Sequence, residues 1–337
     1  MKFIVILITF FGFLHLVSAE EQIVRLRMFA NLSVFPVVSN ARVKAVSDSI
    51  WSLTGKNLVF NQKKLAAKNF IIKKTDDKFD IISIFDFDSY LAGVVSKEMP
   101  LHWPMEALKA QAIVARSFAI AKINERQNKS YHLDANQMDQ VFAITDSEKA
   151  KLAVFLTDQV VLKDRKNKIL KAFYHADCGG QTIPASKVWA GAIDSGTAVD
   201  TWCENRKSNE WVFTISKEAF HSKIPDADTL VIDEIFKGRI QSFRVLENVL
   251  PVQKIRQIFG FGEIKNSPLQ FVQTAHEIFF KGKGFGHGAG LCQWGALAQA
   301  QLGRSYDQIL GHYYPNAQLS ENKIKLSKSF MADLVFN

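Results

Sequence analysis

Short runs of β-branched and aromatic residues alternate with polar turns over the first part of the chain. The runs start at Ile23 and end near Phe87, and Asn, Asp, Ser and Lys separate them. Apolar runs of this length between turn-forming residues are typical of short strands. The pattern predicts a small β-rich N-terminal region over residues 20–80. Its strand-like runs are Ile23–Met28, Phe35–Val38, Asn57–Phe60, Phe70–Lys73 and Phe79–Ile84.

A helical pattern begins after Trp103. Pro104 suits the first position of a helix, and the residues from Met105 to Ile123 are mostly good helix formers. Small apolar residues recur on one face of this segment and allow close packing against a neighbour. We therefore expect one long, alanine-rich helix. The stripe consists of Leu108, Ala112, Ala115 and Ala119.

The middle of the chain alternates strand-like runs with short helical ones. A helix is expected over Val252–Phe259, because Gly260 follows it as a C-terminal cap. The strand-like runs are Val154–Thr157, Val160–Leu162, Ile169–Tyr174, Trp211–Ile215 and Ser242–Leu246. The whole segment runs from about Leu152 to Phe280, and its β-rich part spans about residues 206–280.

Two further helices are predicted near the C-terminus. Leu291–Leu302 is rich in small residues and ends before Gly303, and Ser305 with Gln308 has the sequence of a capping box. No Pro/Ser-rich linker or internal repeat separates the segments. The patterns together predict an α+β fold of mixed β-sheets with a long alanine-rich helix and a C-terminal small-residue helix.

Residues 1–19 have the pattern of a secretory signal peptide. Lys2 precedes an apolar run, and small residues end it at Ala19. We expect cleavage after Ala19 and export to the periplasm, the cell wall or the extracellular space. An uncleaved N-terminal anchor is the alternative. No other stretch is long and apolar enough to predict a membrane span.

The 337 residues are 47% apolar and 22% charged, as in globular proteins. Removal of the signal peptide leaves 41 Lys and Arg against 33 Asp and Glu. A basic exported protein suits a polyanionic neighbourhood such as the cell wall or a membrane surface. No basic run is dense enough to indicate nucleic-acid binding.

The chain has three cysteines, Cys178, Cys203 and Cys292. In an oxidising compartment Cys178 and Cys203 could form a disulfide that closes a modest loop. Cys292 lies in an apolar segment and would remain a buried thiol. The sequence leaves this pairing open.

Glu98 is a lone carboxylate among apolar residues, directly before the long predicted helix. Apolar surroundings disfavour the charged form of a carboxyl group and raise its pKa. A carboxylic acid of this kind can protonate the leaving oxygen of a glycosidic bond. The residues around Glu98 leave open the alternative that it is a surface glutamate with an ordinary pKa.

Lys109 and Arg116 are seven positions apart and therefore lie near one face of the long helix. Arg116 sits in an apolar stretch, where a charge is costly to bury without a partner. The charge of Arg116 could be satisfied by a substrate, by a buried carboxylate, or by exposure of the guanidinium end to solvent.

Five alternating glycines surround His287 in the segment Lys281–Gly290. The spacing matches neither a Walker loop nor a dinucleotide fingerprint, so a tight turn that brings His287 to a cleft is the better interpretation. Cys292 with His287 could instead form a Cys–His hydrolase pair. His175 and Cys178 alone do not supply the four ligands of a structural zinc site, so no metal or other cofactor is expected.

Three segments, taken together, resemble the stage II sporulation protein D family, which includes lytic transglycosylases and amidase-enhancer proteins. The similarity runs from about Phe85 to Leu319, and we assign the catalytic domain to residues 81–325. The segments are Tyr90–Pro100 (YLAGVVSKEMP) with Glu106–Phe118, Phe173–Thr182 (FYHADCGGQT) with Val188–Trp189, and Gly284–Ala296 (GFGHGAGLCQWGA) with Tyr313–Pro315.

The resemblance implies cleavage of peptidoglycan between N-acetylmuramic acid and N-acetylglucosamine, on strands whose stem peptides have been removed, with 1,6-anhydromuramic ends as product. Glu98 aligns with the family's catalytic glutamate. The resemblance assigns Lys109, Arg116 and His175 to orienting the glycan and Glu98. Further candidates for substrate binding are Gln111, His287 and Gln293.

Two departures from the family pattern are visible. Cys292 stands where relatives tend to have Ser, and Asp177-Cys178 replaces small hydroxyl residues. Some relatives hold zinc with Cys and His after the long helix, but Tyr131–Asp139 contains no Cys, so no zinc is expected there. The amidase-enhancer relatives make a second function credible, in which the protein binds the cell wall and activates an N-acetylmuramoyl-L-alanine amidase without cutting glycan itself.

Overall fold

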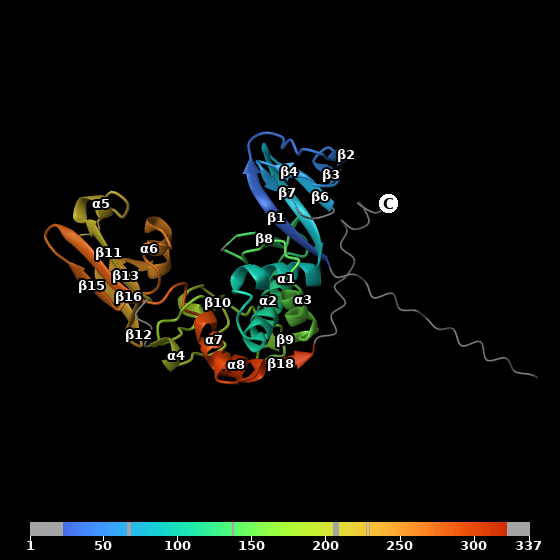
Figure 1. The fold of residues 1–337 in the computed structure, drawn as a ribbon. Helices are drawn as coiled ribbons and strands as arrows, with labels where there is room; N and C mark the ends of the chain where they lie inside the picture. Colours follow the sequence, from blue (N-terminus) through green and yellow to red (C-terminus); the bar gives the residue numbers. More distant parts are fainter. Residues whose placement is uncertain are drawn as a thin grey trace, which may run out of the picture.

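The computed structural model describes residues 23–321, apart from 66–68, 137, 205–208, 227 and 229. The predicted signal peptide, residues 1–19, lies outside the described residues. Figure 1 shows three parts along the chain: an N-terminal sheet, a helical middle and a second β-rich lobe. In this part of the chain, no helix has the length and hydrophobicity needed to cross a bilayer. The predicted α+β fold class is confirmed.

The N-terminal part is a six-stranded sheet in the order β2-β3-β6-β7-β1-β8. Strands β7 and β1 pair antiparallel, and the short β8 pairs parallel to β1 at the edge of the sheet. Its inward side chains form an apolar core around the ring of Phe70. The bounds are β1 Ile23–Leu32, β2 Arg42–Ser47, β3 Ile50–Thr54, β6 Asn69–Thr75, β7 Lys78–Asp86 and β8 Leu133–Asp134, with a separate small hairpin of β4 Val59–Phe60 and β5 Lys63–Lys64.

Two differences from the predicted strands have physical reasons. The run Phe35–Val38 is a loop, and the ring of Phe35 packs edge-on against Trp51 and Phe79 instead of entering the sheet. Strands β2 and β3 were not predicted. The edge strand β2 is almost wholly exposed and carries Arg and Lys, so it has no apolar run to reveal it.

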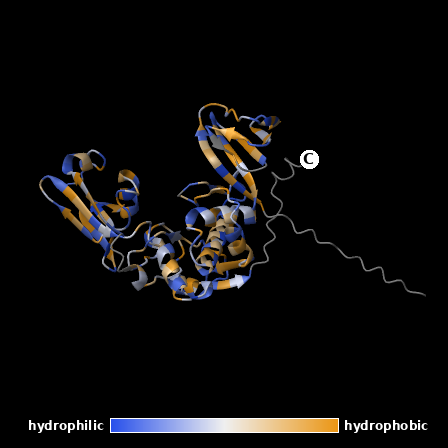
Figure 2. Ribbon diagram, viewed as in Figure 1, coloured by the Kyte–Doolittle hydropathy of each residue, from blue (hydrophilic) through white to orange (hydrophobic). Residues whose placement is uncertain are grey.

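The helical middle is organised around α2 (Met105–Glu125), which is buried along most of its length. Its prediction is confirmed, except that Pro104 is the N-cap residue and not the first helical residue. Helix α1 (Phe87–Glu98) is capped by Asp86, whose side chain accepts a hydrogen bond from the Ser89 amide, and ends at Glu98. The helices α1, α3 (Glu148–Phe155), α7 (Gln293–Gln301) and α8 (Tyr306–Tyr313) all pack on α2. Figure 2 shows hydrophobic residues on these helices as well as on the N-terminal strands.

The strand predicted at Val154–Thr157 is wrong, because this segment lies at the end of α3 and in the turn after it. Ser147 caps the helix by accepting a hydrogen bond from the Ala150 amide. Ala150, Ala153 and Val154 are buried at helical spacing, and this packing on α1 and α2 decides the conformation.

The second β-rich lobe contains two three-stranded antiparallel sheets, β11-β16-β15 and β12-β13-β14. Aromatic rings fill the space between them, with Phe280 in contact with Phe220, Phe243 and Phe271. Helix α6 (Val252–Phe259) ends at Gly260 as predicted. The other bounds are β11 Glu210–Ser216, α5 Lys217–His221, β12 Val231–Phe236, β13 Arg239–Val245, β14 Asn248–Pro251, β15 Gln270–Gln273 and β16 Glu277–Lys283.

Short two-stranded β-pairings lie beside the helices of the middle part. Strand β10 (Tyr174–His175) pairs parallel with β17 (Leu291–Cys292), directly before α7. The predicted capping box of Ser305 and Gln308 is confirmed at the start of α8. The remaining elements are β9 Val160–Lys163, which pairs with β18 Gln318–Glu321, the 3-10 helix η1 Ala185–Lys187 and α4 Thr201–Glu204.

Close approach of α7, α8 and α4 depends on Gly295. A Cβ atom at this position would overlap the Tyr313 hydroxyl and the Asp200 carboxylate, which share a hydrogen bond of 2.6 Å. We predict that Gly295→Ala destabilises the protein by about 1–3 kcal/mol, the usual cost of overpacking a core. The measurement is the midpoint of thermal unfolding, which should fall by several degrees.

The matched control is Gly311→Ala in α8, where a Cβ atom would meet only open space. Alanine is the better helix former, so this variant should be neutral or slightly more stable. Equal midpoints for the two variants would contradict the packing account.

Candidate active site

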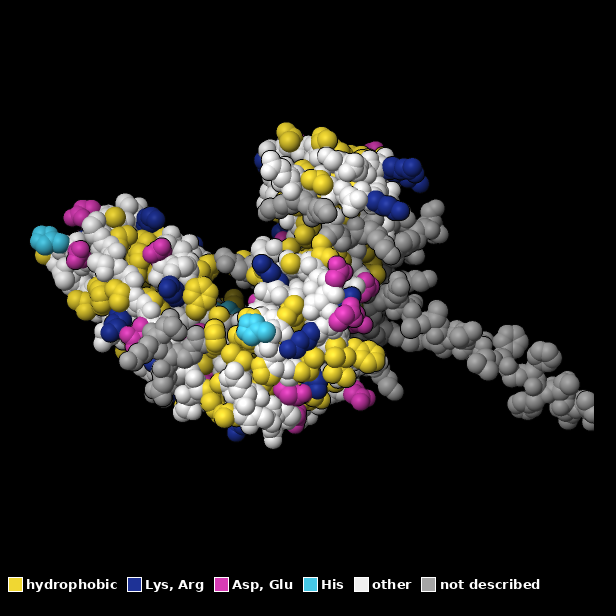
Figure 3. All heavy atoms as spheres, viewed as in Figure 1, with side chains coloured by type: hydrophobic (Ala, Val, Ile, Leu, Met, Phe, Trp, Pro, Cys, Tyr) yellow, Lys and Arg dark blue, Asp and Glu magenta, His cyan; other side chains and the backbone are white. Residues whose placement is uncertain are grey.

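A cavity of about 730 Å³ is lined by residues of the helical middle and of the second β-rich lobe. Its size is in the range of small-molecule sites, roughly 300–1,000 Å³. Side chains come from the end of α1, the C-terminal part of α2, strand β10, the loop at Trp189, helix α6 and the glycine-rich loop at His287. Lys, Arg, Asp and Glu are interspersed over the face of the molecule in Figure 3, so no single-sign patch dominates that face.

Glu98 lines this cavity from the C-terminal end of α1. Its Oε1 accepts hydrogen bonds from the Val141 amide at 3.0 Å and from the Tyr174 hydroxyl at 3.2 Å. Burial raises the pKa of Glu98 above its ordinary value, although these bonds and a hydrogen bond from Gln293 act in the opposite direction. The partial negative charge at a helix C-terminus disfavours the carboxylate as well.

Gly93 brings the loop that holds Val141 against α1. A Cβ atom at this helical glycine would overlap the ring of Phe142 and the carbonyl of Ala143. The missing side chain therefore lets residues 141–143 lie directly on the helix. This contact sets the position of the Val141 amide that binds Glu98.

Tyr174 is fixed by a short chain of buried hydrogen bonds. Tyr90 donates to Gln140 Oε1 at 2.8 Å, and Gln140 Nε2 donates to the Tyr174 oxygen at 3.3 Å. Burial raises the pKa of Tyr174 well above its ordinary value, so the hydroxyl keeps its proton and can donate to Glu98. The orientation of the Glu98 carboxyl group thus depends on side chains from three separate segments.

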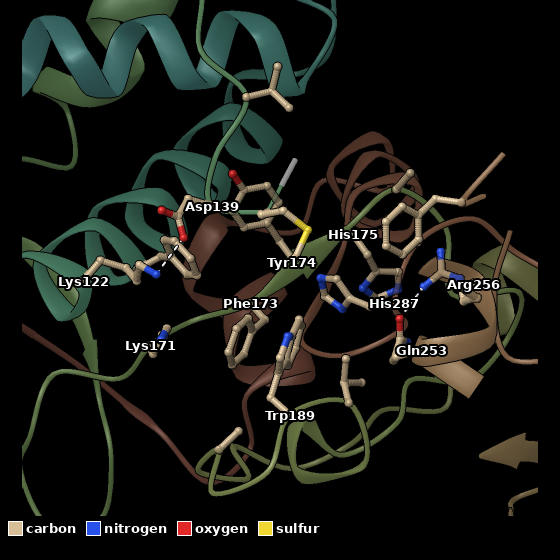
Figure 4. Close-up of a pocket in the computed structure, with 18 of the residues that line it drawn as sticks. Lys122, Asp139, Lys171, Phe173, Tyr174, His175, Trp189, Gln253, Arg256 and His287 are labelled. Atoms are coloured by element: carbon tan, nitrogen blue, oxygen red, sulfur yellow. Dashed lines mark hydrogen bonds and ion pairs between the residues drawn. The ribbon is translucent and has the colours of Figure 1, made fainter. Parts of the chain in front are cut away.

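Aromatic rings form one wall of the cavity. Phe173 and Trp189 stack with ring centroids 3.9 Å apart and planes 13° from parallel. His287 meets the Trp189 ring edge-on at 4.7 Å, and His175 lies 5.4 Å from His287. Figure 4 shows these four rings side by side, with Arg256 on the far side of His287. Such a wall offers an apolar face beside polar groups.

The two histidines that the sequence predicted at the site both line the cavity. Burial and the neighbouring His175 and Arg256 hold the pKa of His287 well below its ordinary value, so His287 is neutral. His175 Nδ1 lies 3.0 Å from the Ala289 carbonyl oxygen, which requires the proton on Nδ1. The His175 side chain also interacts with the side chain of the buried Cys292.

Gln293 and Gln111 lie behind Glu98. Gln293 lines the cavity and donates to Gln111 Oε1 at 3.4 Å. Gln111 is fully buried on α2 and does not line the cavity. It therefore reaches the site through Gln293.

Lys109 and Arg116 lie elsewhere on α2 and do not line this cavity. Lys109 forms an ion pair with Glu106 at 2.7 Å, and Glu106 also accepts a hydrogen bond from the Tyr306 amide of α8. The Arg116 guanidinium is buried and donates to carbonyl oxygens at the end of α3 and in the turn after it, including that of Thr157 at 2.6 Å. These contacts stabilise the helix packing, and a role in glycan binding stays a prediction for both residues.

The sequence analysis did not identify five charged residues that line the cavity. Lys122 forms a buried ion pair with Asp139 at 2.7 Å, and Lys171 pairs with Glu125 at 2.8 Å. Arg256 donates to Gln253 and to the carbonyls of Ile264 and Lys265, and burial lowers its pKa to about 10. No sequence motif connects α6 with Glu98, because the two segments are far apart in the sequence and only the tertiary fold brings them to the same cavity.

The cysteines lie outside the cavity. All three are buried free thiols, and Cys292 is fully buried without lining the cavity. This position does not support the alternative in which Cys292 and His287 form a hydrolase pair. The pairing of Cys178 with Cys203 stays a prediction.

Comparisons with known proteins agree with this geometry. A family model described as stage II sporulation protein matches residues 75–163, which include Glu98 and all of α2. The stage II sporulation protein D of Bacillus amyloliquefaciens is 30% identical over 267 residues, covering 72% of this chain and 76% of that protein. An uncharacterised protein of Brachyspira hyodysenteriae is 27% identical over 274 residues, covering 77% and 73% of the two chains.

A further relative is the amidase enhancer of Bacillus subtilis. It is 25% identical over 290 residues, covering 68% of this chain but only 40% of the enhancer. The relative from Bacillus amyloliquefaciens shows the family, because the similarity extends over most of both chains at 30% identity. The chain therefore belongs to the stage II sporulation protein D family.

Proposed function

We propose that the protein is a lytic transglycosylase that cleaves peptidoglycan glycan strands with Glu98 as its acid and base. The observation that carries the proposal is the Glu98 carboxyl group, which lines the cavity, is held by Val141 and Tyr174 and has a raised pKa. A carboxyl group that is protonated near neutral pH can donate to a leaving oxygen.

In the proposed reaction, Glu98 gives its proton to the oxygen that leaves C1 of N-acetylmuramic acid. The C1–oxygen bond breaks, and the C6 hydroxyl of the same sugar forms a new bond to C1. Glu98 then takes the proton of that hydroxyl, so the acid is regenerated and no water is consumed. The product end is 1,6-anhydro-N-acetylmuramic acid. The attacking hydroxyl belongs to the substrate, so its effective concentration is high.

The other carboxylates of the cavity are held in ion pairs, which supports a mechanism in which Glu98 is the only catalytic carboxyl group. Among the described residues that line the cavity, Asp139 is paired with Lys122 and Arg126, and Glu125 is paired with Lys171. Glu98 forms no such ion pair with a described residue. Ordinary glycosidases need a second carboxylate to act as nucleophile or to activate water. A transglycosylase does not need one.

The cavity lining is suited to a glycan whose stem peptide has been removed. The exposed side of the Trp189–Phe173 stack can pack against the C–H face of a sugar. Removal of the peptide leaves a free lactyl carboxylate on muramic acid. Arg256 would attract this carboxylate, since its own hydrogen bonds go to carbonyls and an amide and its pKa of about 10 keeps it charged.

The cell wall is the proposed place of action, reached by export through the predicted signal peptide. A second candidate function rests on the similarity to the amidase enhancer of Bacillus subtilis. In that case the cavity would bind glycan without cutting it, and the partner would be an N-acetylmuramoyl-L-alanine amidase. An assay of the reaction products separates the two functions.

We predict that Glu98→Gln lowers the formation of anhydro-muramic ends about 10²–10⁴-fold, because the amide cannot donate the proton. The purified protein is incubated with glycan strands with and without stem peptides, and the products are measured by mass spectrometry. The matched control is Glu148→Gln, the same change at an exposed glutamate at the start of α3, which should keep full activity.

Absence of anhydro products from the wild type on both substrates would contradict the transglycosylase proposal. Faster release of stem peptides only when an amidase is added would support the enhancer function. Products that carry water at the new muramic end would indicate a hydrolase.

We predict that Trp189→Ala raises the KM for glycan strands about 3- to 10-fold with a smaller effect on kcat, because it removes a stacking surface. Trp189→Phe keeps an aromatic face and should restore most of the affinity. The measurement is the initial rate against strand concentration. An unchanged KM in Trp189→Ala would exclude this wall from the binding site.

A further inference from the structure

Three cysteines from three separate segments meet in the interior behind the active site. Cys178 follows β10, Cys203 lies in α4, and Cys292 ends β17 at the N-cap of α7. The Sγ atoms of Cys203 and Cys292 are 3.3 Å apart. All three residues are fully buried, with no exposed surface.

A carboxylate completes this group. A side-chain oxygen of Asp177 and the three Sγ atoms all lie within 4.8 Å of one another. Asp177 is buried, and its carboxylate accepts hydrogen bonds from Asn209 Nδ2 at 3.1 Å and from the Gly179 amide at 2.7 Å. Such outer contacts orient a carboxylate that binds a metal.

Backbone amides point at the sulfur of Cys292. The amide of Cys178 donates to Sγ at 3.3 Å, and the amide of Gly295 donates to it at 3.4 Å. Amides directed at one sulfur favour its thiolate form, the form that binds metal. The bond from Gly295 also makes Cys292 the N-cap of α7, and the bond from Cys178 joins two of the cysteine segments.

A buried cation lies directly beside the group. Arg239 of β13 is 1% exposed and donates to the carbonyl oxygens of Cys178 at 2.6 Å and of Gly179 at 3.2 Å. Its other hydrogen bonds go to Asn266 and to the carbonyls of Ser267 and Lys283. Asp177 and Cys178 lie close enough to favour the charge of this buried guanidinium, and thiolates at the site would add to that negative charge.

We propose that Cys178, Cys203, Cys292 and Asp177 form a structural Zn²⁺ site. Three soft sulfur ligands and one oxygen match the four-ligand preference of zinc. Binding would release the thiol protons to solvent and leave a negatively charged centre next to Arg239. The expectation of no metal considered only ligands near one another in the sequence, whereas folding gathers these four from three segments.

The proposed site would hold the back of the active site together. Cys292 pairs with His175 between β17 and β10, and it directly precedes Gln293, which contacts Glu98. A metal bound here would tie both of these segments to α4. This proposal does not depend on the proposed transglycosylase reaction, because its test measures metal content and thiols and does not measure glycan cleavage.

The experiment measures metal in the full chain, purified after export from an expressing host without chelators. We expect about one zinc ion per chain by elemental mass spectrometry. Replacement of zinc by cobalt should give the strong near-ultraviolet absorption of thiolate-to-cobalt charge transfer. Alkylation of the denatured protein after metal removal should modify all three cysteines.

Cys203→Ser should lose the zinc and the cobalt absorption, while Glu98→Gln, altered in the active site, should keep both. Circular dichroism shows whether the Cys203→Ser variant is folded. If this variant does not fold, the metal content of the wild-type protein still decides the proposal. Three free thiols without metal would overturn the proposal. A Cys178–Cys203 disulfide, seen as one alkylated cysteine and no zinc, would overturn it as well.

Discussion

Close packing on the small residues of α2 is the constraint on which the rest of the structure depends. The buried alanines of α2 allow α1, α3, α7 and α8 to approach one helix from several directions. The end of α1 carries Glu98, and the start of α7 carries Gln293. Their meeting at one cavity is therefore a consequence of helix packing and not of any local sequence.

The chemistry of Glu98 rests on a balance between burial and hydrogen bonds. Burial and the end of α1 disfavour its charge, whereas Val141, Tyr174 and Gln293 stabilise the carboxylate. An acid that must give a proton and then take one back needs both influences. Less burial would leave the pKa of Glu98 closer to its ordinary value and make it a weaker proton donor, whereas fewer hydrogen bonds would leave the carboxylate less stabilised after it has given its proton.

Local sequence predicted the elements whose stability is local. The period of α2, the cap of α6 at Gly260 and the capping box at Ser305 were all visible in the sequence. The edge strand β2 and the helix at Val154 were missed, because exposure in one case and packing in the other decided the conformation.

The site residues also divide into those that local sequence predicted and those that only the tertiary fold revealed. Glu98, His175, His287 and Gln293 lie in motifs that point to one cavity, and the structure brings them together there. Arg256 and the contacts of Arg116 come from long-range packing and left no pattern in the sequence. The central claim is that this site raises the pKa of Glu98 above its ordinary value. The most direct test is an NMR titration of that carboxyl group in protein carrying ¹³C-labelled glutamate, with the signal assigned by Glu98→Gln. The account predicts a midpoint above the ordinary 4.5, raised further in Tyr174→Phe. A midpoint at or below that value would contradict it.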